Sequence, residues 1–168
     1  MNNKEETPLN SIWNLLTQIP DPEVPAINIV ELGVVRDIIL HKDSLEITIT
    51  PTYTGCPAMK MMEEDILALL TEKGYQNIKI KTIFSPAWTT DWMTEETKAK
   101  LITYGIAPPD KTDNENLFPF LKEKKKVLSC PFCNSVDTVL KSQFGSTACK
   151  ALYYCNECRQ PFEHFKCH

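Results

Sequence analysis

Two different spacings of apolar residues alternate along the first 107 residues, and they predict helices and strands in turn. Apolar side chains recur every three or four positions after Pro8 and after Pro57, which is typical of amphipathic helices that begin with proline. Residues 45–50 and 78–81 alternate between apolar and polar side chains, and residues 34–40 are rich in strand-forming residues. With a last helix expected over residues 93–104, the predicted order is α-β-β-α-β-α.

Prolines and glycines indicate where these elements end. Pro20-Asp21-Pro22 must end the first helix, because proline lacks a backbone donor and restricts the residue before it. Gly74 is expected to end the second helix, and residues 41–44 to join the first two strands into a hairpin. A helix between the second and third strands would make those strands parallel. The expected fold class is therefore α+β, a small two-layer α/β sandwich.

Composition divides the chain into three parts. Residues 1–107 carry 9 basic and 15 acidic side chains, whereas residues 127–168 carry 4 and 3. Residues 108–126 begin with a Pro-Pro pair, end with a run of lysines and have little periodicity, so they are interpreted as a linker. The expected domains are therefore 1–107 and 127–168, joined by 108–126.

Net charge and hydropathy exclude some partners. The 168 residues carry a formal net charge of −4, which argues against a general nucleic-acid-binding protein. No apolar run approaches the roughly 20 residues of a membrane span, and the first residues lack the apolar region of a signal peptide. We therefore expect no membrane partner and a cytoplasmic location.

Six of the seven cysteines lie in the last 39 residues, and four of them form two CxxC pairs. Cys130-Pro-Phe-Cys133 and Cys155-Asn-Glu-Cys158 have the spacing of a structural Zn(Cys)4 site, in which each short turn directs two sulfurs at one ion. A segment of about forty residues cannot bury an adequate core without such support. The sequence predicts a C-terminal zinc-ribbon mini-domain, with an iron–sulfur cluster on the same thiolates as the alternative.

The remaining cysteines of this segment are open to several interpretations. Cys149 is not needed for a four-thiolate site. Its thiol could be buried in the core, compete as a fifth metal ligand or be reactive, and burial is the commonest fate of a free cysteine. Cys167 and His168, with His164 nearby, form either a soft metal-binding tail or a frayed terminus.

Cys56 is the second candidate site. It stands alone in the first domain, in Thr52-Tyr-Thr54-Gly-Cys56-Pro57, directly before the second predicted helix. With Pro57 at the first helical position, Cys56 would be the cap residue, where free N–H groups favour a thiolate. The alternative is a small apolar side chain that fills the junction of loop and helix. A catalytic Cys–His pair is not expected, because His41 lies in a predicted turn.

Asp21 and Glu23 form a small acidic loop between three prolines. Their carboxylates are candidates for metal binding, although from spacing alone capping and solvation of the loop are the simpler interpretation.

These segments together resemble a known family. Residues 10–105 resemble the SufT-like iron–sulfur assembly domain through Asp21-Pro-Glu-Val-Pro25, Asn28-Ile-Val-Glu-Leu-Gly33 and Gly55-Cys56-Pro57. Nearly the whole chain resembles the D subunits of bacterial phenylacetyl-CoA epoxidase systems, through residues 51–58, 85–92, 104–109 and 144–153.

The resemblance implies a non-catalytic role in phenylacetate catabolism. It implies an accessory or maturation factor that helps the metal centres of a monooxygenase system to form, with oxygenase and reductase components and iron–sulfur assembly proteins as partners. Cys56 matches the functional thiol of the assembly family, Asp21 and Glu23 match its acidic loop, and Thr52 and Thr54 flank the thiol. A transient iron or iron–sulfur cluster is implied beside structural zinc.

Three other functions stay open at this point. An accessory factor would use the ribbon as its docking module, whereas the chain could instead be a structural subunit that remains in the oxygenase complex. A cysteine-dependent hydrolase or transferase is opposed by the lack of a suitable histidine. A nucleic-acid-binding ribbon protein is opposed by the charge balance.

Overall fold

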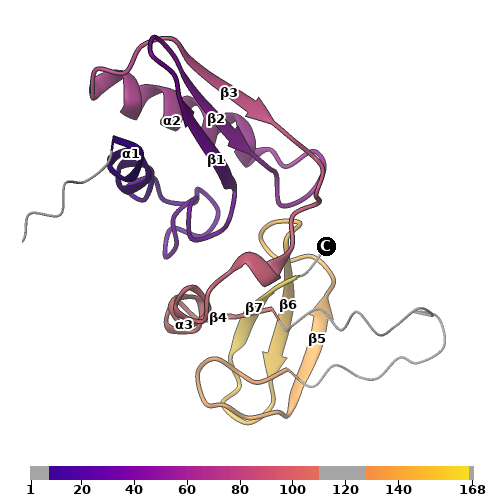
Figure 1. Cartoon of the computed structure of the whole chain (residues 1–168). Coiled ribbons are helices and arrows are strands. Elements are labelled where there is room, and N and C mark those ends of the chain that lie inside the picture. Colours follow the sequence, from indigo (N-terminus) through magenta and orange to yellow (C-terminus); the bar gives the residue numbers. More distant parts are fainter. Residues whose placement is uncertain (1–7, 110–127, 167–168) are drawn as a thin grey trace, which may run out of the picture. The chain divides into compact units, whose positions relative to one another are not determined.

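The computed structural model describes residues 8–109 and 128–166 (Figure 1). The chain divides into two compact units, the first ending at Trp88 and the second beginning at Thr89. Each unit has its own sheet.

The first unit has the predicted sequence of elements up to its third strand. Its elements are α1 (Pro8–Leu16), β1 (Val35–Leu40), β2 (Leu45–Ile49), α2 (Ala58–Glu72) and β3 (Ile78–Thr82). The sheet order is β1-β2-β3, with β1 antiparallel and β3 parallel to β2. The predicted hairpin and the predicted parallel pairing through α2 are therefore confirmed.

The core of this unit lies between the sheet and its two helices. α1 packs against β1, and α2 packs against β3. The side chains that are fully or almost fully buried come from every layer and include Ile12, Leu16, Ile47, Ile49, Met62, Ile66 and Leu70. Their spacing of two in β2 and of four in α2 is the periodicity expected of a strand and a helix that share a core.

The second unit begins before the expected linker. Its elements are η1 (Thr90–Trp92), α3 (Glu95–Thr103), β4 (Ile106–Ala107), β5 (Thr138–Ser142), β6 (Lys150–Cys155) and β7 (Pro161–Phe165). The sheet order is β4-β7-β6-β5, with β4 parallel to β7 and the other neighbours antiparallel.

This division differs from the domains expected from composition. The expected boundary followed residue 107, but β4 pairs with β7, in the register Ile106↔Glu163 and Ala107↔His164. The backbone hydrogen bonds of a strand require its neighbour, so residues 89–109 group with the ribbon. Most of the expected linker lies outside the described residues. Within residues 8–109 and 128–166, no helix combines the length and apolar character needed to cross a bilayer.

Candidate functional site

The structure brings the four cysteines of the two CxxC pairs together. Their sulfur atoms all lie within 4.8 Å of one another. The Sγ atoms of Cys130 and Cys158 are 3.7 Å apart, and those of Cys133 and Cys155 are 3.6 Å apart. A tetrahedral zinc site with bonds of about 2.3 Å has sulfur–sulfur edges of about 3.8 Å, whereas a disulfide bond is about 2.05 Å long. The geometry is that of a four-thiolate metal site.

The two CxxC turns have the same backbone construction. Each pair is followed by a residue with a left-handed conformation, Asn134 at φ 60° and Arg159 at φ 59°. The N–H of each first cysteine donates to the carbonyl five residues later, in the pairs Cys130–Ser135 (2.9 Å) and Cys155–Gln160 (3.0 Å). In both turns, backbone hydrogen bonds position the sulfurs without the help of a metal ion.

The thiols of this cluster differ in their electrostatic environment. The backbone N–H of Cys158 donates to the sulfur of Cys155 and lowers the pKa of that thiol to about 7. Burial raises the pKa of Cys158 to about 12. Four thiolates so close together repel one another, and a divalent cation offsets that repulsion as it displaces the protons.

The cysteines are also part of the core of the second unit. Cys130 and Cys155 are fully buried in a cluster with Ala107, Leu128 and Phe162. This core is small, so the metal would supply a large share of the stability of the ribbon.

The structure describes only one of the two remaining C-terminal cysteines. Cys149 is buried, and its sulfur lies 3.0 Å from the hydroxyl oxygen of Thr147, outside the four-cysteine cluster. Burial, the commonest fate of a free cysteine, is therefore what the structure shows. Cys167 and His168 lie outside the described residues.

Cys56 lies one position further from α2 than the sequence suggested. α2 begins at Ala58, and Pro57 is its cap residue with φ −69° and ψ −23°. Because Pro57 already has helical backbone angles, Cys56 becomes the residue before the cap, and its carbonyl accepts the N–H of Met59 at 3.4 Å. The Cys56 thiol is half-buried in the turn that begins at Tyr53.

The threonines around Cys56 have separate environments. Thr50 is buried, and its hydroxyl donates to the carbonyl of Ile83 at 2.9 Å, which ties the end of β2 to the segment after β3. Thr52 is buried, whereas Thr54 is exposed at the tip of the loop. Thr50 therefore fixes the start of the Cys56 loop.

The carboxylate of Asp21 shapes the acidic loop. Asp21 is 4% exposed, and its Oδ1 accepts the N–H groups of Glu23 at 3.0 Å and Val24 at 2.6 Å. Such side-chain caps stabilise turns that lack backbone partners. A structural role for Asp21 is thus evident, while Glu23 is half-buried.

The Cys56 loop leaves the end of the first sheet at which β1 begins. Val35 pairs with Ile49, and the N–H of Thr50 donates to the carbonyl of Val34 at 2.9 Å, so the start of β1 meets the end of β2. The end of β3 joins them, because the N–H of Ile83 donates to Ile49. Among the described residues, the four cysteines of the second unit are the one group of three or more potential ligands whose side chains lie close enough to share a metal ion. No such group therefore lies at this end of the first sheet.

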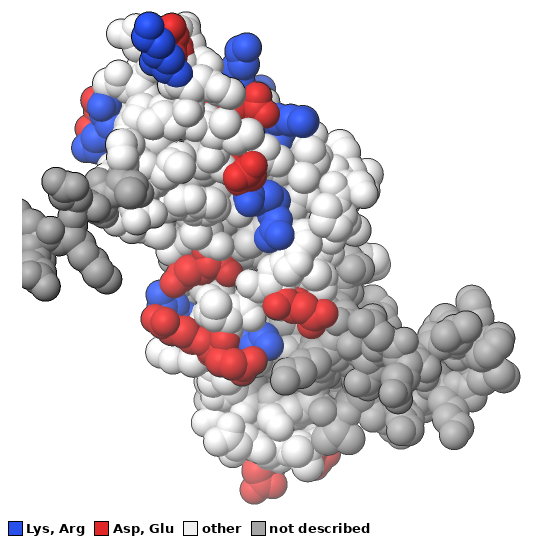
Figure 2. Space-filling model, viewed as in Figure 1, with Lys and Arg blue, Asp and Glu red and all other residues white. Residues whose placement is uncertain are grey.

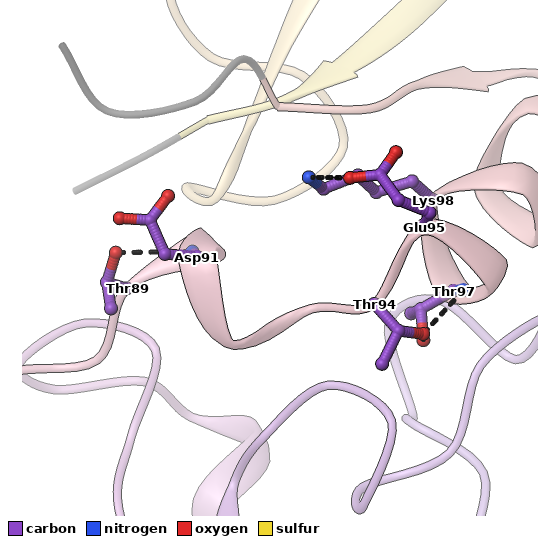
Figure 3. A network of polar contacts seen from close by, with 6 residues as sticks. All are labelled: Thr89, Asp91, Thr94, Glu95, Thr97 and Lys98. Atoms are coloured by element: carbon purple, nitrogen blue, oxygen red, sulfur yellow. Dashed lines mark hydrogen bonds and ion pairs between the residues drawn. The ribbon is translucent and has the colours of Figure 1, made fainter.

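An acidic region over η1 and α3 has a local structural explanation. Figure 2 shows acidic side chains gathered there, and Asp91, Glu95 and Glu96 are exposed. Thr94 caps α3 by accepting the N–H of Thr97, and Glu95 pairs with Lys98 at a distance of 3.0 Å (Figure 3). Glu95 and Glu96 lie in the first turn of α3, where acidic residues interact favourably with the helix dipole, so both are accounted for without a ligand.

Comparisons with known proteins identify both parts of the chain. The family described as "Iron-sulfur cluster assembly protein" matches residues 9–79, and "PaaD zinc beta ribbon domain" matches residues 115–166. The fold and the site thus define an iron–sulfur assembly domain followed by a zinc ribbon. The chain is 44% identical over 160 residues to the D subunit of a putative 1,2-phenylacetyl-CoA epoxidase of Escherichia coli (strain K12), covering 95% of this chain and 93% of that protein. It belongs to the family of phenylacetyl-CoA epoxidase D subunits.

Two further similarities concern the first unit. The chain is 32% identical over 103 residues to "Fe-S protein maturation auxiliary factor" of Porphyromonas gingivalis (strain ATCC BAA-308 / W83), covering 60% of this chain and 97% of that protein. The crystal structure of a domain of unknown function, DUF59, from Bacillus anthracis superposes with a TM-score of 0.52 at 27% identity, covering 55% of this chain and 89% of that one.

Proposed function

We propose that this chain is an accessory factor that assists assembly of a metal centre in the multicomponent phenylacetyl-CoA epoxidase of aerobic phenylacetate degradation. The observation that carries the proposal is the position of Cys56. Its half-buried thiol lies on a loop fixed by three strand ends, and it is separate from the closed four-cysteine cluster. The name of the E. coli relative supports the link to the epoxidase, and the name of the P. gingivalis relative supports a role in maturation.

In this proposal Cys56 handles iron, sulfide or a cluster in transit. Thr52 and Thr54 belong to its loop, and Asp21 and Glu23 lie on the acidic loop between α1 and β1. Asp21 would act by holding the shape of the acidic loop, as its hydrogen bonds to Glu23 and Val24 suggest. Catalysis would belong to the partner proteins of the epoxidase, so the chain itself would not be an enzyme.

The metal of the ribbon is proposed to be structural zinc. Cys130, Cys133, Cys155 and Cys158 would hold it, and four thiolates leave no open position for a substrate. Bound zinc would cross-link the two CxxC turns and would take no part in a reaction. The ribbon is then free to act as a docking module for the oxygenase or reductase components in the cytoplasm.

A second candidate function is that of a structural component of the oxygenase complex. The observation that favours it is the name of the E. coli relative, which describes a subunit of the epoxidase and matches almost the whole chain. Stable co-purification in stoichiometric amount would be expected of a structural component, whereas a maturation factor would act in smaller amounts.

The test is to produce the oxygenase and reductase components with and without this chain. Iron and sulfide per reductase, and iron per oxygenase, are then measured on the purified components. A maturation role predicts lower metal content when the chain is missing, in at least one component. Equal iron and sulfide contents in both preparations would contradict it.

A further inference from the structure

The loop between β5 and β6 presents an exposed aromatic ring on a fixed backbone. Phe144 is 65% exposed. Its N–H donates to the hydroxyl of Ser142 at 3.2 Å, and the N–H of Gly145 donates to the carbonyl of Lys150 at 2.8 Å. An exposed aromatic side chain on an ordered backbone loses little conformational freedom on binding, which is the property of a good interface anchor.

An internal ion pair holds this loop in place. Lys150 Nζ lies 2.9 Å from Glu163 Oε2, and the Lys150 side chain is 4% exposed. The other carboxylate oxygen, Oε1, accepts the N–H of Ser146 at 2.6 Å. A Cβ atom at Gly145 would lie 2.6 Å from that same oxygen, so a side chain at this position would displace the Glu163 carboxylate from the loop. Charge-assisted hydrogen bonds of this kind give the loop a defined position.

Two lysines lie against aromatic rings, one on β6 and one in the loop that follows β5. Lys166 Nζ is 4.5 Å from the centre of the Phe144 ring and donates to the carbonyl of Gln143 at 2.8 Å, and Lys141 Nζ is 5.3 Å from the centre of the Tyr154 ring. Over the described parts of the chain, neither ammonium group forms an ion pair. We call Lys141, Phe144, Tyr154 and Lys166 the Phe144 surface. It combines aromatic faces with two positive charges on a chain whose net charge is −4.

We infer that the Phe144 surface docks a partner protein that has an apolar pocket for the Phe144 ring and carboxylates around it for the two lysines. Two lysines are too few for a nucleic acid, whose binding depends on many phosphate contacts. Acidic side chains on a protein fit them better, because they pair with the ammonium groups while the ring is buried. This inference rests on the proposed function, which makes the partner a component of the epoxidase.

The test measures binding of the full-length chain to the purified oxygenase and reductase components, at low and at high salt. Phe144→Ala removes the anchor, and Lys141→Glu reverses one charge without touching the hydrogen bonds of the loop. Matched controls are Tyr104→Ala, an aromatic residue 55% exposed, and Lys79→Glu, an exposed lysine of β3. Metal content and unfolding midpoint are checked for each variant.

We expect Phe144→Ala to weaken binding roughly tenfold or more, as for a central interface anchor. Lys141→Glu should also weaken binding and reduce its dependence on salt, while the controls stay within about twofold of the wild type. Tight wild-type binding that neither Phe144→Ala nor Lys141→Glu changes would overturn the inference and leave the proposed function standing. No binding by the wild type would contradict both.

Two further results would assign the surface differently and so overturn the inference. One is self-association of the chain that Phe144→Ala weakens, with component binding unchanged, which would make the occupant a second copy. The other is binding of a labelled single-stranded oligonucleotide that depends on Phe144 and Lys141.

Discussion

The indole N–H of Trp88 donates to the carbonyl of Leu32 at 2.9 Å, although the two residues are 56 positions apart in the sequence. Trp88 is 3% exposed, and Leu32 lies in the turn that Asn28 and Glu31 stabilise through hydrogen bonds to backbone N–H groups. This contact ties the segment after β3 to the segment that precedes β1. Both segments leave the end of the sheet that carries the Cys56 loop.

Trp88→Phe should therefore destabilise the first unit. The change keeps an aromatic ring but leaves the buried carbonyl of Leu32 without this donor, which typically costs about 1–3 kcal/mol. The measurement is denaturant unfolding followed by circular dichroism. Trp13→Phe, at a half-buried position of α1, is the control, and an equal loss of stability in both variants would contradict the assigned role.

Replacing Glu163 should destabilise the ribbon in a pH-dependent way. Burial raises the pKa of Glu163, but the N–H of Ser146 and the ammonium of Lys150 outweigh it and hold the pKa below its usual range. A lowered pKa in the folded state stabilises the fold above the unfolded value of about 4.3, and this contribution disappears as the pH falls through the folded value.

Glu163→Gln should thus lower the free energy of unfolding at pH 7, by about 3 kcal/mol, because it leaves Lys150 buried without its counter-charge. The difference from the wild type should shrink as the pH is lowered from 7 to 3. Glu157→Gln, at an exposed position, should change stability by less than about 0.5 kcal/mol. A difference that is constant over this pH range would contradict the ion pair's role.

Metal removal should unfold the ribbon. Cys133→Ser should release the metal, because three thiolates bind it far more weakly than four, and the small core around Cys130 and Cys155 cannot hold the fold alone. Cys149→Ser is the matched control, since Cys149 is buried outside the cluster. Elemental analysis should find one zinc per chain in the wild type and in Cys149→Ser. A metal-free chain whose ribbon stays folded in a strong chelator would show that the site is not structural.

The sequence allowed the local elements of the first unit to be predicted, because each has its own periodicity. The alternation in β2, the helical spacing in α2 and Gly74, at φ 89° after the helix, are all local signals. The four-cysteine cluster was predictable for a similar reason, since short CxxC turns fix their own geometry.

What the sequence could not predict depends on long-range contacts. β4 has two residues and no periodicity of its own, so its pairing with β7, and with it the assignment of residues 89–109 to the second unit, was not foreseen. The hydrogen bond from Trp88 to Leu32 and the pair of Lys150 with Glu163 join distant segments in the same way. The two tryptophans after β3 were visible in the sequence, but which of them is buried was not.

The position of Cys56 shows how accurately the sequence predicts the start of a helix. The sequence placed the start of α2 within one residue, yet that one residue decides whether Cys56 or Pro57 is the cap. Cap positions depend on backbone angles that proline can adopt on either side of the boundary, so sequence alone does not settle them.

The most direct test of the proposed function is phenylacetyl-CoA epoxidation in cells whose only copy of this chain carries Cys56→Ser. Ser is close to Cys in volume, so folding, ribbon metal content and protein level should match the wild type, as they should for the control Cys149→Ser. We predict that epoxidation is lost with Cys56→Ser and retained with Cys149→Ser. Normal epoxidation at a normal level of the Cys56→Ser chain would contradict a maturation role for this thiol.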